Sequence, residues 1–236
     1  MTAAEFRALH HTGRTLVLPG PWDAASARVF ADAGFPALAT PSAGVSASLG
    51  YEDGETPADE MFAAVARIAR AVDIPVSADV EDGYGLAPKE LVARILDTGA
   101  VGCNLEDSSG GVLKDPHAHA EWLAEVRAEA GDRLFVNARV DTFLHGVTDP
   151  AEAVARALLY VEAGVDCIYP IMAPTEELKV LAAAIPAPLN ALALPGGPSP
   201  QRLGELGATR VTFGPGLHRR AMAAVAEIAQ EYGPVR

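Results

Sequence analysis

The 236-residue chain is poor in cysteine, in positive charge and in long apolar segments. Its two cysteines, Cys103 and Cys167, lie inside apolar runs that are typical of buried strands. We therefore expect two reduced core thiols rather than a disulfide or a nucleophile, as is usual in an intracellular protein. The 18 basic residues against 31 acidic ones give a formal net charge of −13. This balance argues against nucleic acid as a partner, because phosphate binding requires a basic stripe.

The sequence also lacks segments that would take the chain into a membrane. No apolar run approaches the roughly 20 residues that span a bilayer, and no basic segment followed by an apolar one opens the chain. We expect a cytoplasmic protein with no membrane partner. Half of the residues are hydrophobic, which supplies a sizeable core and argues against disorder. No linker or shift in composition divides the chain, so we expect a single domain over residues 1–236.

Short β-rich runs alternate with amphipathic helical patterns along the whole chain, which indicates βα units around a parallel sheet. The predicted strands are residues 15–19, 37–40, 76–79, 102–105, 134–139, 167–171, 189–192 and 210–213. The predicted helices are residues 24–33, 58–72, 88–98, 116–130, 150–163, 176–185, 200–206 and 217–231. Eight units in about 250 residues are the usual size of a (β/α)8 TIM barrel, and this is the α/β fold that we predict.

Polar residues follow four of the predicted strands, at the end where the active sites of such barrels lie. Asp79 and Glu81 end the third strand, Glu106 follows the fourth, Arg139 ends the fifth and Asn190 lies in the seventh. Any single acid could merely cap a helix or face solvent, but this explanation is weak for all of them together. Several carboxylates at one mouth repel one another unless a cation lies between them, and such oxygen ligands suit Mg²⁺ or Mn²⁺.

Arg139 and segment 40–48 each admit two interpretations, and the histidines indicate no particular function. Arg139 either clamps a substrate carboxylate or forms a structural ion pair with the acids. The small residues of segment 40–48 form either an anion-binding concavity of N–H groups or a close-packed turn. The six histidines show no ligand spacing, and His117 and His119 point to different sides of a predicted helix. We expect these histidines at the surface.

Several short motifs occur in the order and at the strands of a known family. They are PWDAASA at 21–27, SASLG at 46–50, DVEDGYG at 79–85, LED at 105–107, NARVDT at 137–142 and PLN at 188–190, followed by Gly197 and Ser199. In this arrangement the chain resembles the isocitrate lyase/phosphoenolpyruvate mutase superfamily over nearly its whole length. The resemblance implies a (β/α)8 barrel, assembly into homo-oligomers (dimers or tetramers), a Mg²⁺ site, and small 2-oxo, 2-hydroxy or enolpyruvyl acids as anionic substrates.

The resemblance also implies roles for residues at the matching positions. Asp79 corresponds to the direct magnesium ligand, while Asp53, Glu81 and Glu106 correspond to residues that act on the metal through water or from behind its direct ligands. A second group of residues corresponds to substrate-binding and catalytic positions. It comprises Arg139 as carboxylate clamp, the backbone of Ser42 and Ala43 as an N–H cradle for the same carboxylate, the active-site Asn190, and Lys114 in the loop after the fourth strand.

The sequence departs from the family pattern in three places. Its segment 108–116, SSGGVLKDP, lacks the cysteine with which isocitrate and methylisocitrate lyases protonate the departing carbanion. Lys114 is the one counterpart in this segment of the lysine and asparagine that hold the phosphoryl group in phosphonomutases. Glu81 stands where an aspartate is usual, and the chain is short at its C-terminus for an exchanged helix.

Three functions follow as hypotheses. The leading one is a carbon–carbon lyase that forms an enolate of a pyruvate- or glyoxylate-like product, with charge stabilised by the metal ion and with Arg139, Glu106 and Lys114 as catalytic residues. The second is an isomerase that makes or breaks the phosphorus–carbon bond of a phosphonopyruvate-type substrate. The third is a metabolite-binding protein that retains the metal site without catalysis.

Overall fold

The computed structural model describes residues 2–233, in which eight parallel strands form the wall of a barrel. These strands are β1 (Leu16–Val17), β2 (Leu38–Ala39), β3 (Val76–Asp79), β4 (Gly102–Leu105), β7 (Phe135–Val140), β8 (Cys167–Pro170), β9 (Asn190–Leu192) and β10 (Arg210–Thr212). They pair in the orders β2-β3-β4-β7-β8 and β1-β10-β9. A bridge between Ile168 and Leu189 and a hydrogen bond of 3.2 Å from Ala39 N to Pro19 O join the two sheets. The predicted (β/α)8 fold is confirmed.

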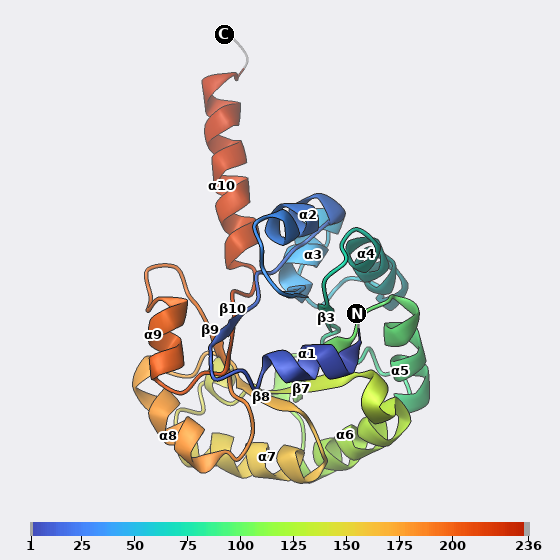
Figure 1. The fold of residues 1–236 in the computed structure, drawn as a ribbon, viewed down its shortest axis with the longest axis vertical. Helices are drawn as coiled ribbons and strands as arrows, with labels where there is room; N and C mark the ends of the chain where they lie inside the picture. The colour runs from blue at the N-terminus through green and yellow to red at the C-terminus, as the bar shows by residue number, and fades with distance from the viewer. Residues whose placement is uncertain (1, 234–236) are drawn as a thin grey trace.

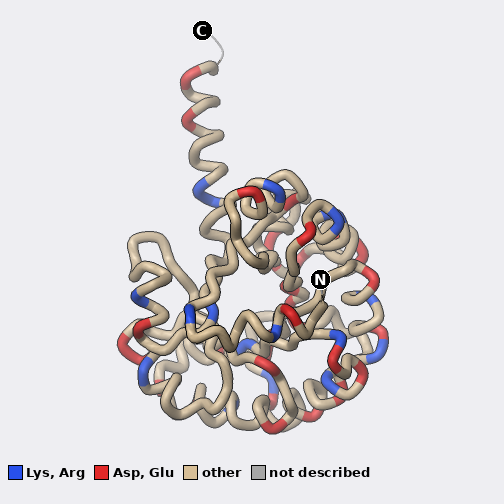
Figure 2. The backbone as a smooth tube through the Cα atoms, in the orientation of Figure 1, with Lys and Arg blue, Asp and Glu red and all other residues tan. Residues whose placement is uncertain are grey.

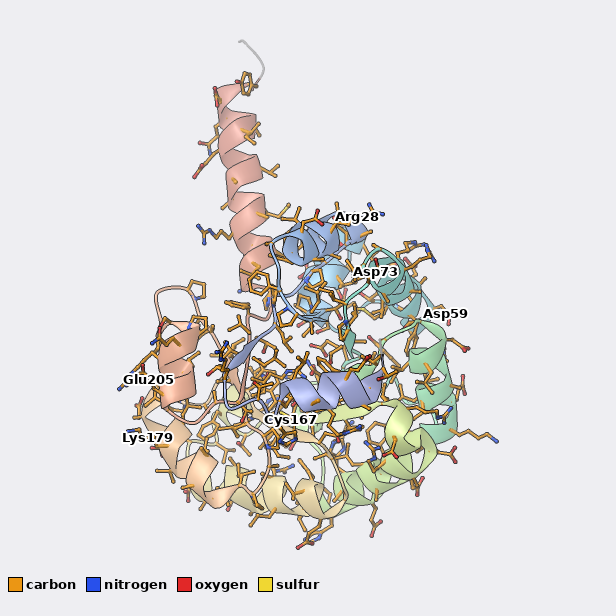
Figure 3. All side chains as sticks on the ribbon, viewed as in Figure 1. Arg28, Asp59, Asp73, Cys167, Lys179 and Glu205 are labelled. Carbon is orange, nitrogen blue, oxygen red and sulfur yellow. The ribbon has the colours of Figure 1, made fainter. Side chains whose placement is uncertain are left out.

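Helices surround the strands as a ring, and one of them projects from it (Figure 1). The ring contains α2 (Ala24–Asp32), α3 (Ser42–Leu49), α4 (Ala58–Arg70), α5 (Pro88–Asp97), α6 (Pro116–Ala130), α7 (Pro150–Glu162), α8 (Leu178–Ala184) and α9 (Pro200–Glu205). The last helix, α10 (Gly216–Glu231), extends away from the barrel. Lys, Arg, Asp and Glu residues occur largely along the outer ring of the backbone (Figure 2), whereas Cys167 lies among the side chains that fill the barrel (Figure 3).

One open end of the barrel is closed by α1 (Ala3–Leu9), which the sequence patterns do not predict. Phe6 from this helix is fully buried and packs edge-on against Phe135, the first residue of β7, with ring centroids 5.1 Å apart. His10 at the helix end stacks on the same Phe135 ring at 4.2 Å. Since these contacts lie at the amino ends of the strands, they leave the opposite end of the barrel for a site.

The predicted strands and helices occur at their predicted places, with ends shifted by a few residues. Both β3 and β4 begin and end at the predicted residues. The interval 176–185 is divided between a 3-10 turn (Thr175–Glu177) and α8, and segment 40–48 contains a helix, α3, rather than a turn. The loop after β4 forms a small antiparallel hairpin of β5 (Ser108–Ser109) and β6 (Val112–Leu113).

The prediction for the cysteines is confirmed, and the surface prediction for the histidines is wrong for three of the six. Cys103 and Cys167 are fully buried and free of any disulfide. His10, His119 and His218 are buried, whereas His117 is exposed. A neutral imidazole packs like an aromatic ring: His119 lies 5.4 Å from the Trp122 ring and 5.2 Å from the Tyr160 ring. Within residues 2–233, no helix has the length and apolar character needed to cross a membrane.

Buried His119 gives a prediction for the pH dependence of stability. Burial lowers the pKa of His119 from 6.5 to about 3, so the folded protein does not take up the proton that the unfolded chain accepts. The contribution to stability is complete above pH 6.5 and is lost as the pH falls toward 3, by about 1.4 kcal/mol per pH unit. His119→Phe keeps the ring packing and removes the proton site.

The loss of unfolding free energy between pH 7 and pH 5, measured by urea denaturation, should therefore be about 2 kcal/mol smaller in His119→Phe than in the wild type. His117→Phe, on the exposed face of the same helix, is the control and should behave as the wild type does. An equal pH dependence in all three proteins would contradict the burial of a neutral His119.

Candidate active site

The acidic residues predicted at the strand ends gather at the end of the barrel opposite α1. Asp79, the last residue of β3, is only 8% exposed. Its backbone N–H donates to Thr40 Oγ1 at 3.0 Å, and its carboxylate accepts from Ser42 Oγ at 3.4 Å and from the N–H of Glu81 at 3.3 Å. Glu106 follows β4, the neighbouring strand. Adjacent parallel strands therefore bring these acids to one mouth.

The shifts in pKa show that these carboxylates are crowded. Burial, partly offset by Arg139, raises the pKa of Asp79, and the charge of Asp53 raises it further. Burial together with the charges of Asp79 and Asp53 raises the pKa of Glu81 to about 7. Burial also raises the pKa of Glu106, although Arg139 opposes the shift. Each carboxylate thus meets too little positive charge in the protein itself.

A divalent cation fits this donor set. Oxygen ligands suit Mg²⁺, and a positive ion would relieve the repulsion that raises the pKa values. Among the described residues, no three His, Cys, Asp or Glu side chains form a preassembled metal site. Mg²⁺ usually keeps several waters and takes only one or two protein carboxylates directly.

The loop after β3 holds Glu81 in an unusual backbone conformation. Glu81 and Tyr84 have φ angles of 52° and 56°, in the left-handed region that favours glycine. The Tyr84 hydroxyl donates to Glu81 Oε1 at 3.3 Å, which fixes the carboxylate despite the strained backbone. Strain of this kind is found mainly at functional sites.

Arg139 forms ion pairs and still faces the mouth. Its Nε donates to Asp141 Oδ1 at 2.9 Å, and its Nη1 contacts Glu106 Oε1. These two contacts involve Nε and Nη1 of Arg139, and neither involves Nη2. The two interpretations of Arg139 are therefore compatible: two acids orient the guanidinium, and its remaining N–H groups can meet a substrate carboxylate.

The helix α3 begins beside Asp79 and offers backbone donors. Its first residues are Ser42 and Ala43, and Pro41 at the N-cap provides no side-chain acceptor. The first N–H groups of a helix have no partner within the helix, and the helix dipole favours an anion there. Because Ser42 also touches Asp79, these donors lie where a ligand carboxylate would meet the acidic cluster. The concavity interpretation of segment 40–48 is thus compatible with a helix.

For two predicted site residues, the described contacts do not include the carboxylates of Asp79, Glu81 or Glu106, although Lys114 Nζ pairs with Asp82 Oδ2 at 3.5 Å. Lys114 Nζ donates to Asp82 O at 3.3 Å and Glu106 O at 3.4 Å and lies 5.6 Å from the Trp122 ring. Asn190 is fully buried in the barrel interior, where its Nδ2 donates to Thr212 Oγ1 at 3.0 Å and its Oδ1 has no partner among residues 2–233. Their catalytic and substrate-binding roles stay predictions.

The sequence patterns did not single out several residues that border the site. They are Thr40 and Tyr84, which fix Asp79 and Glu81, Ser108, which donates to Asp141 at 2.5 Å, and Tyr169, whose hydroxyl accepts from Thr212 at 3.3 Å. Their position at strand ends was the available signal.

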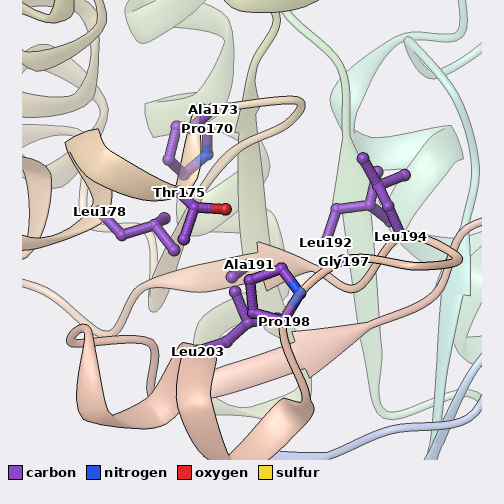
Figure 4. Close-up of a pocket in the computed structure, with 10 residues that line it drawn as sticks. All are labelled: Pro170, Ala173, Thr175, Leu178, Ala191, Leu192, Leu194, Gly197, Pro198 and Leu203. Atoms are coloured by element: carbon purple, nitrogen blue, oxygen red, sulfur yellow. The ribbon is translucent and has the colours of Figure 1, made fainter.

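An apolar pocket of about 120 Å³ lies apart from the acids, between the ends of β8 and β9 and the helices α8 and α9 (Figure 4), and no carboxylate lines it.

Comparison with known proteins identifies the family. The family described as phosphoenolpyruvate phosphomutase matches residues 6–232. The chain belongs to this family, and so to the isocitrate lyase/phosphoenolpyruvate mutase superfamily of enzymes that act on carboxylic acids. An uncharacterized protein of Mycobacterium tuberculosis H37Rv is 37% identical over 227 residues, 95% of this chain and 87% of that protein. The 2,3-dimethylmalate lyase of Eubacterium barkeri is 33% identical and covers 84% of this chain and 73% of its own.

Solved structures agree with this family. A Burkholderia cenocepacia J2315 protein, provisionally described as a phosphonomutase, is 39% identical with a TM-score of 0.91, and the match covers 97% of this chain and 99% of that one. A phosphonopyruvate hydrolase in complex with oxalate and Mg²⁺ is 25% identical with a TM-score of 0.88, over 100% of this chain and 89% of that one. Both lyases and enzymes of phosphonate chemistry are thus among the relatives.

The crowded acids predict the behaviour of Asp79→Asn. The amide keeps the shape of the side chain and removes one charge from the mouth, so the metal-free protein should gain thermal stability by a few degrees. Affinity for Mn²⁺, measured by calorimetry, should fall strongly because a carboxylate ligand is lost. Asp97→Asn, at an exposed acid near the end of α5, should change neither quantity. Unchanged Mn²⁺ affinity in Asp79→Asn would show that the cation binds elsewhere.

Proposed function

We propose that this protein is a Mg²⁺-dependent carbon–carbon lyase. Its substrate is a small 2-hydroxy or 2-oxo di- or tricarboxylic acid, and its product resembles pyruvate or glyoxylate. The supporting observation is the meeting of Asp79, Glu106 and Arg139 at one mouth, next to the first N–H groups of α3. The relation to a lyase of 2,3-dimethylmalate, a substituted malate, favours the same type of bond cleavage.

The proposed site divides the work between cationic and acidic residues. Arg139 and the N–H groups of Ser42 and Ala43 bind one carboxylate of the substrate and orient it. Asp79 is the direct ligand of Mg²⁺, with Glu81, Asp53 and Glu106 around it, and the bound ion supplies stabilisation of negative charge. The related hydrolase whose structure holds oxalate and Mg²⁺ supports this choice of ligand and cofactor.

Glu106 and Lys114 are the remaining proposed catalytic residues. Glu106 contacts Arg139, and burial together with the charges of Asp79 and Glu81 raises its pKa. It therefore connects the proposed carboxylate clamp with the proposed metal ligands. Lys114 is the cationic residue of the hairpin segment 108–116, where the lyases of the family carry their cysteine. Its contacts with Asp82 and Glu106 support a role at the edge of the proposed site.

A second candidate function is supported by a separate observation. The solved structure with 39% identity is provisionally described as a phosphonomutase, and it covers almost the whole of both chains. In that reaction Arg139 would bind the carboxylate and Lys114 would hold the migrating phosphoryl group. Phosphorus NMR distinguishes the candidates, because interconversion of phosphoenolpyruvate and phosphonopyruvate would favour the mutase and its absence would remove it.

The lyase proposal predicts turnover of a defined class of acids. Purified protein with Mg²⁺ should release pyruvate or glyoxylate from at least one member of a panel of oxaloacetate, alkyl-malates and related acids. Arg139→Lys should reduce this turnover by about a hundredfold or more, because lysine cannot make the bidentate contact. No product from any acid of the panel would remove the lyase. If phosphorus NMR also shows no interconversion while oxalate still binds, a metabolite-binding protein remains.

We also propose that the protein is a homo-oligomer that assembles through α10. Four apolar side chains of this segment are between 43% and 77% exposed, namely Met222, Val225, Ile228 and Tyr232. The helix projects from the barrel, so a second copy is the natural cover for this surface (Figure 1).

The proposed assembly can be tested by the mass in solution. Light scattering should give a dimer or tetramer for the wild type, and Val225→Asp with Ile228→Asp should give a smaller species with an intact fold. The matched control is Glu227→Ala, which lies between the two substituted positions and leaves the apolar surface in place. A monomeric wild type would contradict the assembly.

A further inference from the structure

The helix α7 carries two polar side chains that point toward the active-site end of the barrel wall. Arg156 and Tyr160 are four residues apart and therefore share one face of the helix. Tyr160 is fully buried, and Arg156 Nη1 donates to its hydroxyl oxygen at 3.3 Å. Both also donate to Asp107 Oδ2, Tyr160 at 2.8 Å and Arg156 at 3.0 Å.

Asp107 joins this helix to two loops at the mouth. Its side chain is completely buried, and its Oδ1 accepts from the backbone N–H of Asp141 at 2.7 Å. Its backbone carbonyl accepts from the N–H of Lys114 at 2.8 Å. The residue thus fixes both the end of β7 and the far side of the hairpin, and Arg156 supplies the positive charge that its buried carboxylate needs.

Asp141 continues the connection to the substrate clamp. Its Oδ1 accepts from Arg139 Nε at 2.9 Å, and its Oδ2 accepts from Ser108 Oγ at 2.5 Å. Asp141 is fully buried, so both oxygens are shielded from bulk solvent. A continuous chain of hydrogen bonds therefore runs from Tyr160 and Arg156 to the guanidinium of Arg139.

Such a connection matters because an arginine side chain loses much rotamer freedom when it is fixed. A clamp that is already oriented before the ligand arrives does not lose that freedom on binding, and the affinity is correspondingly higher. The contact of Arg139 with Glu106 holds only one end of the guanidinium. The contact with Asp141 at Nε fixes the plane in which the remaining N–H groups lie.

From this geometry we infer that Tyr160 and Arg156 are positioning residues, which act through Asp107 and Asp141 to orient Arg139 for a carboxylate ligand. The inference rests on the proposed function, in which Arg139 is the clamp. Neither side chain touches the substrate in this scheme. Their loss should therefore weaken carboxylate binding without removing any group that binds it.

A purely structural role of the same residues makes a different prediction. The bottom of the barrel holds a similar contact, in which Arg127 Nη1 donates to Asp166 Oδ2 at 2.9 Å, beside the amino end of β7. Arg127→Met removes this contact far from the mouth and is the matched control for Arg156→Met. Both variants should lose thermal stability. Only Arg156→Met should lose affinity for the ligand.

The experiment measures binding of oxalate in the presence of Mg²⁺ by calorimetry in the full-length protein. Tyr160→Phe removes a single hydroxyl, and its oxalate affinity should fall about tenfold, as expected for a lost hydrogen bond to a charged group. The oxalate affinity of Arg156→Met should fall by a similar factor. Because Arg156 lies nearer the surface, this variant takes the place of Tyr160→Phe if that protein does not fold. Wild-type affinity in the folded variants would overturn the inference.

A double-mutant cycle shows whether the effect passes through Arg139. Tyr160→Phe is combined with Arg139→Lys, which retains a cation but cannot accept orientation through Nε. In this background Tyr160→Phe should change oxalate affinity much less than tenfold, because the clamp to be oriented is gone. The same fold-change in both backgrounds would overturn the inference.

The two proposals fail in different ways. If Arg139→Lys itself leaves oxalate affinity unchanged, Arg139 is not the clamp, and both the proposed site and the positioning role are wrong. If Arg139→Lys weakens binding while Tyr160→Phe and Arg156→Met do not, the site stands and only the positioning role is wrong.

Discussion

Repulsion among buried carboxylates is the constraint around which the mouth of this barrel is organised. At an effective dielectric constant of about 20, two like charges about 4 Å apart repel by about 4 kcal/mol. Asp79, Glu81 and Glu106 share a mouth in which burial and mutual charge raise their pKa values. Arg139 offsets part of this repulsion and is itself held by Glu106 and Asp141. In the proposed function, a divalent cation would offset the remaining negative charge and an anionic ligand would bind beside it.

The interior of the barrel supports this mouth from the side of the amino ends of the strands. The amino ends of the strands are closed by apolar packing of Phe6 and Phe135. Above this lies a buried polar layer, in which Arg210 Nη2 and Asn137 Nδ2 both donate to Asn104 Oδ1, at 3.2 and 2.7 Å. Other atoms of Arg210, Asn137 and Asn190 have no partner in the part of the chain that the structure describes, a situation that ordered water usually resolves in protein interiors. The acids thus sit on a polar interior rather than directly on the hydrophobic core.

The sequence predicted the barrel and its acidic strand ends because both are local patterns. Alternating βα units locate the strands, and Asp79 and Glu106 could be placed at the mouth from their position after β3 and β4. What depends on distant contacts could not be predicted. The bond from Tyr160 to Asp107 joins residues 53 positions apart, and nothing in either local sequence indicates it. His119 was misplaced because an imidazole that stacks on Trp122 is as easily buried as a phenyl ring.

The central claim is that Asp79 binds a divalent cation while Arg139 and the start of α3 bind a carboxylate beside it. The most direct test is a crystal structure with Mn²⁺ and oxalate, in which anomalous scattering locates the metal. We expect the anomalous peak in contact with the Asp79 carboxylate, with oxalate between the ion, the Arg139 guanidinium and the N–H groups of Ser42 and Ala43. A peak away from Asp79, or oxalate bound without contact to Arg139, would contradict the account.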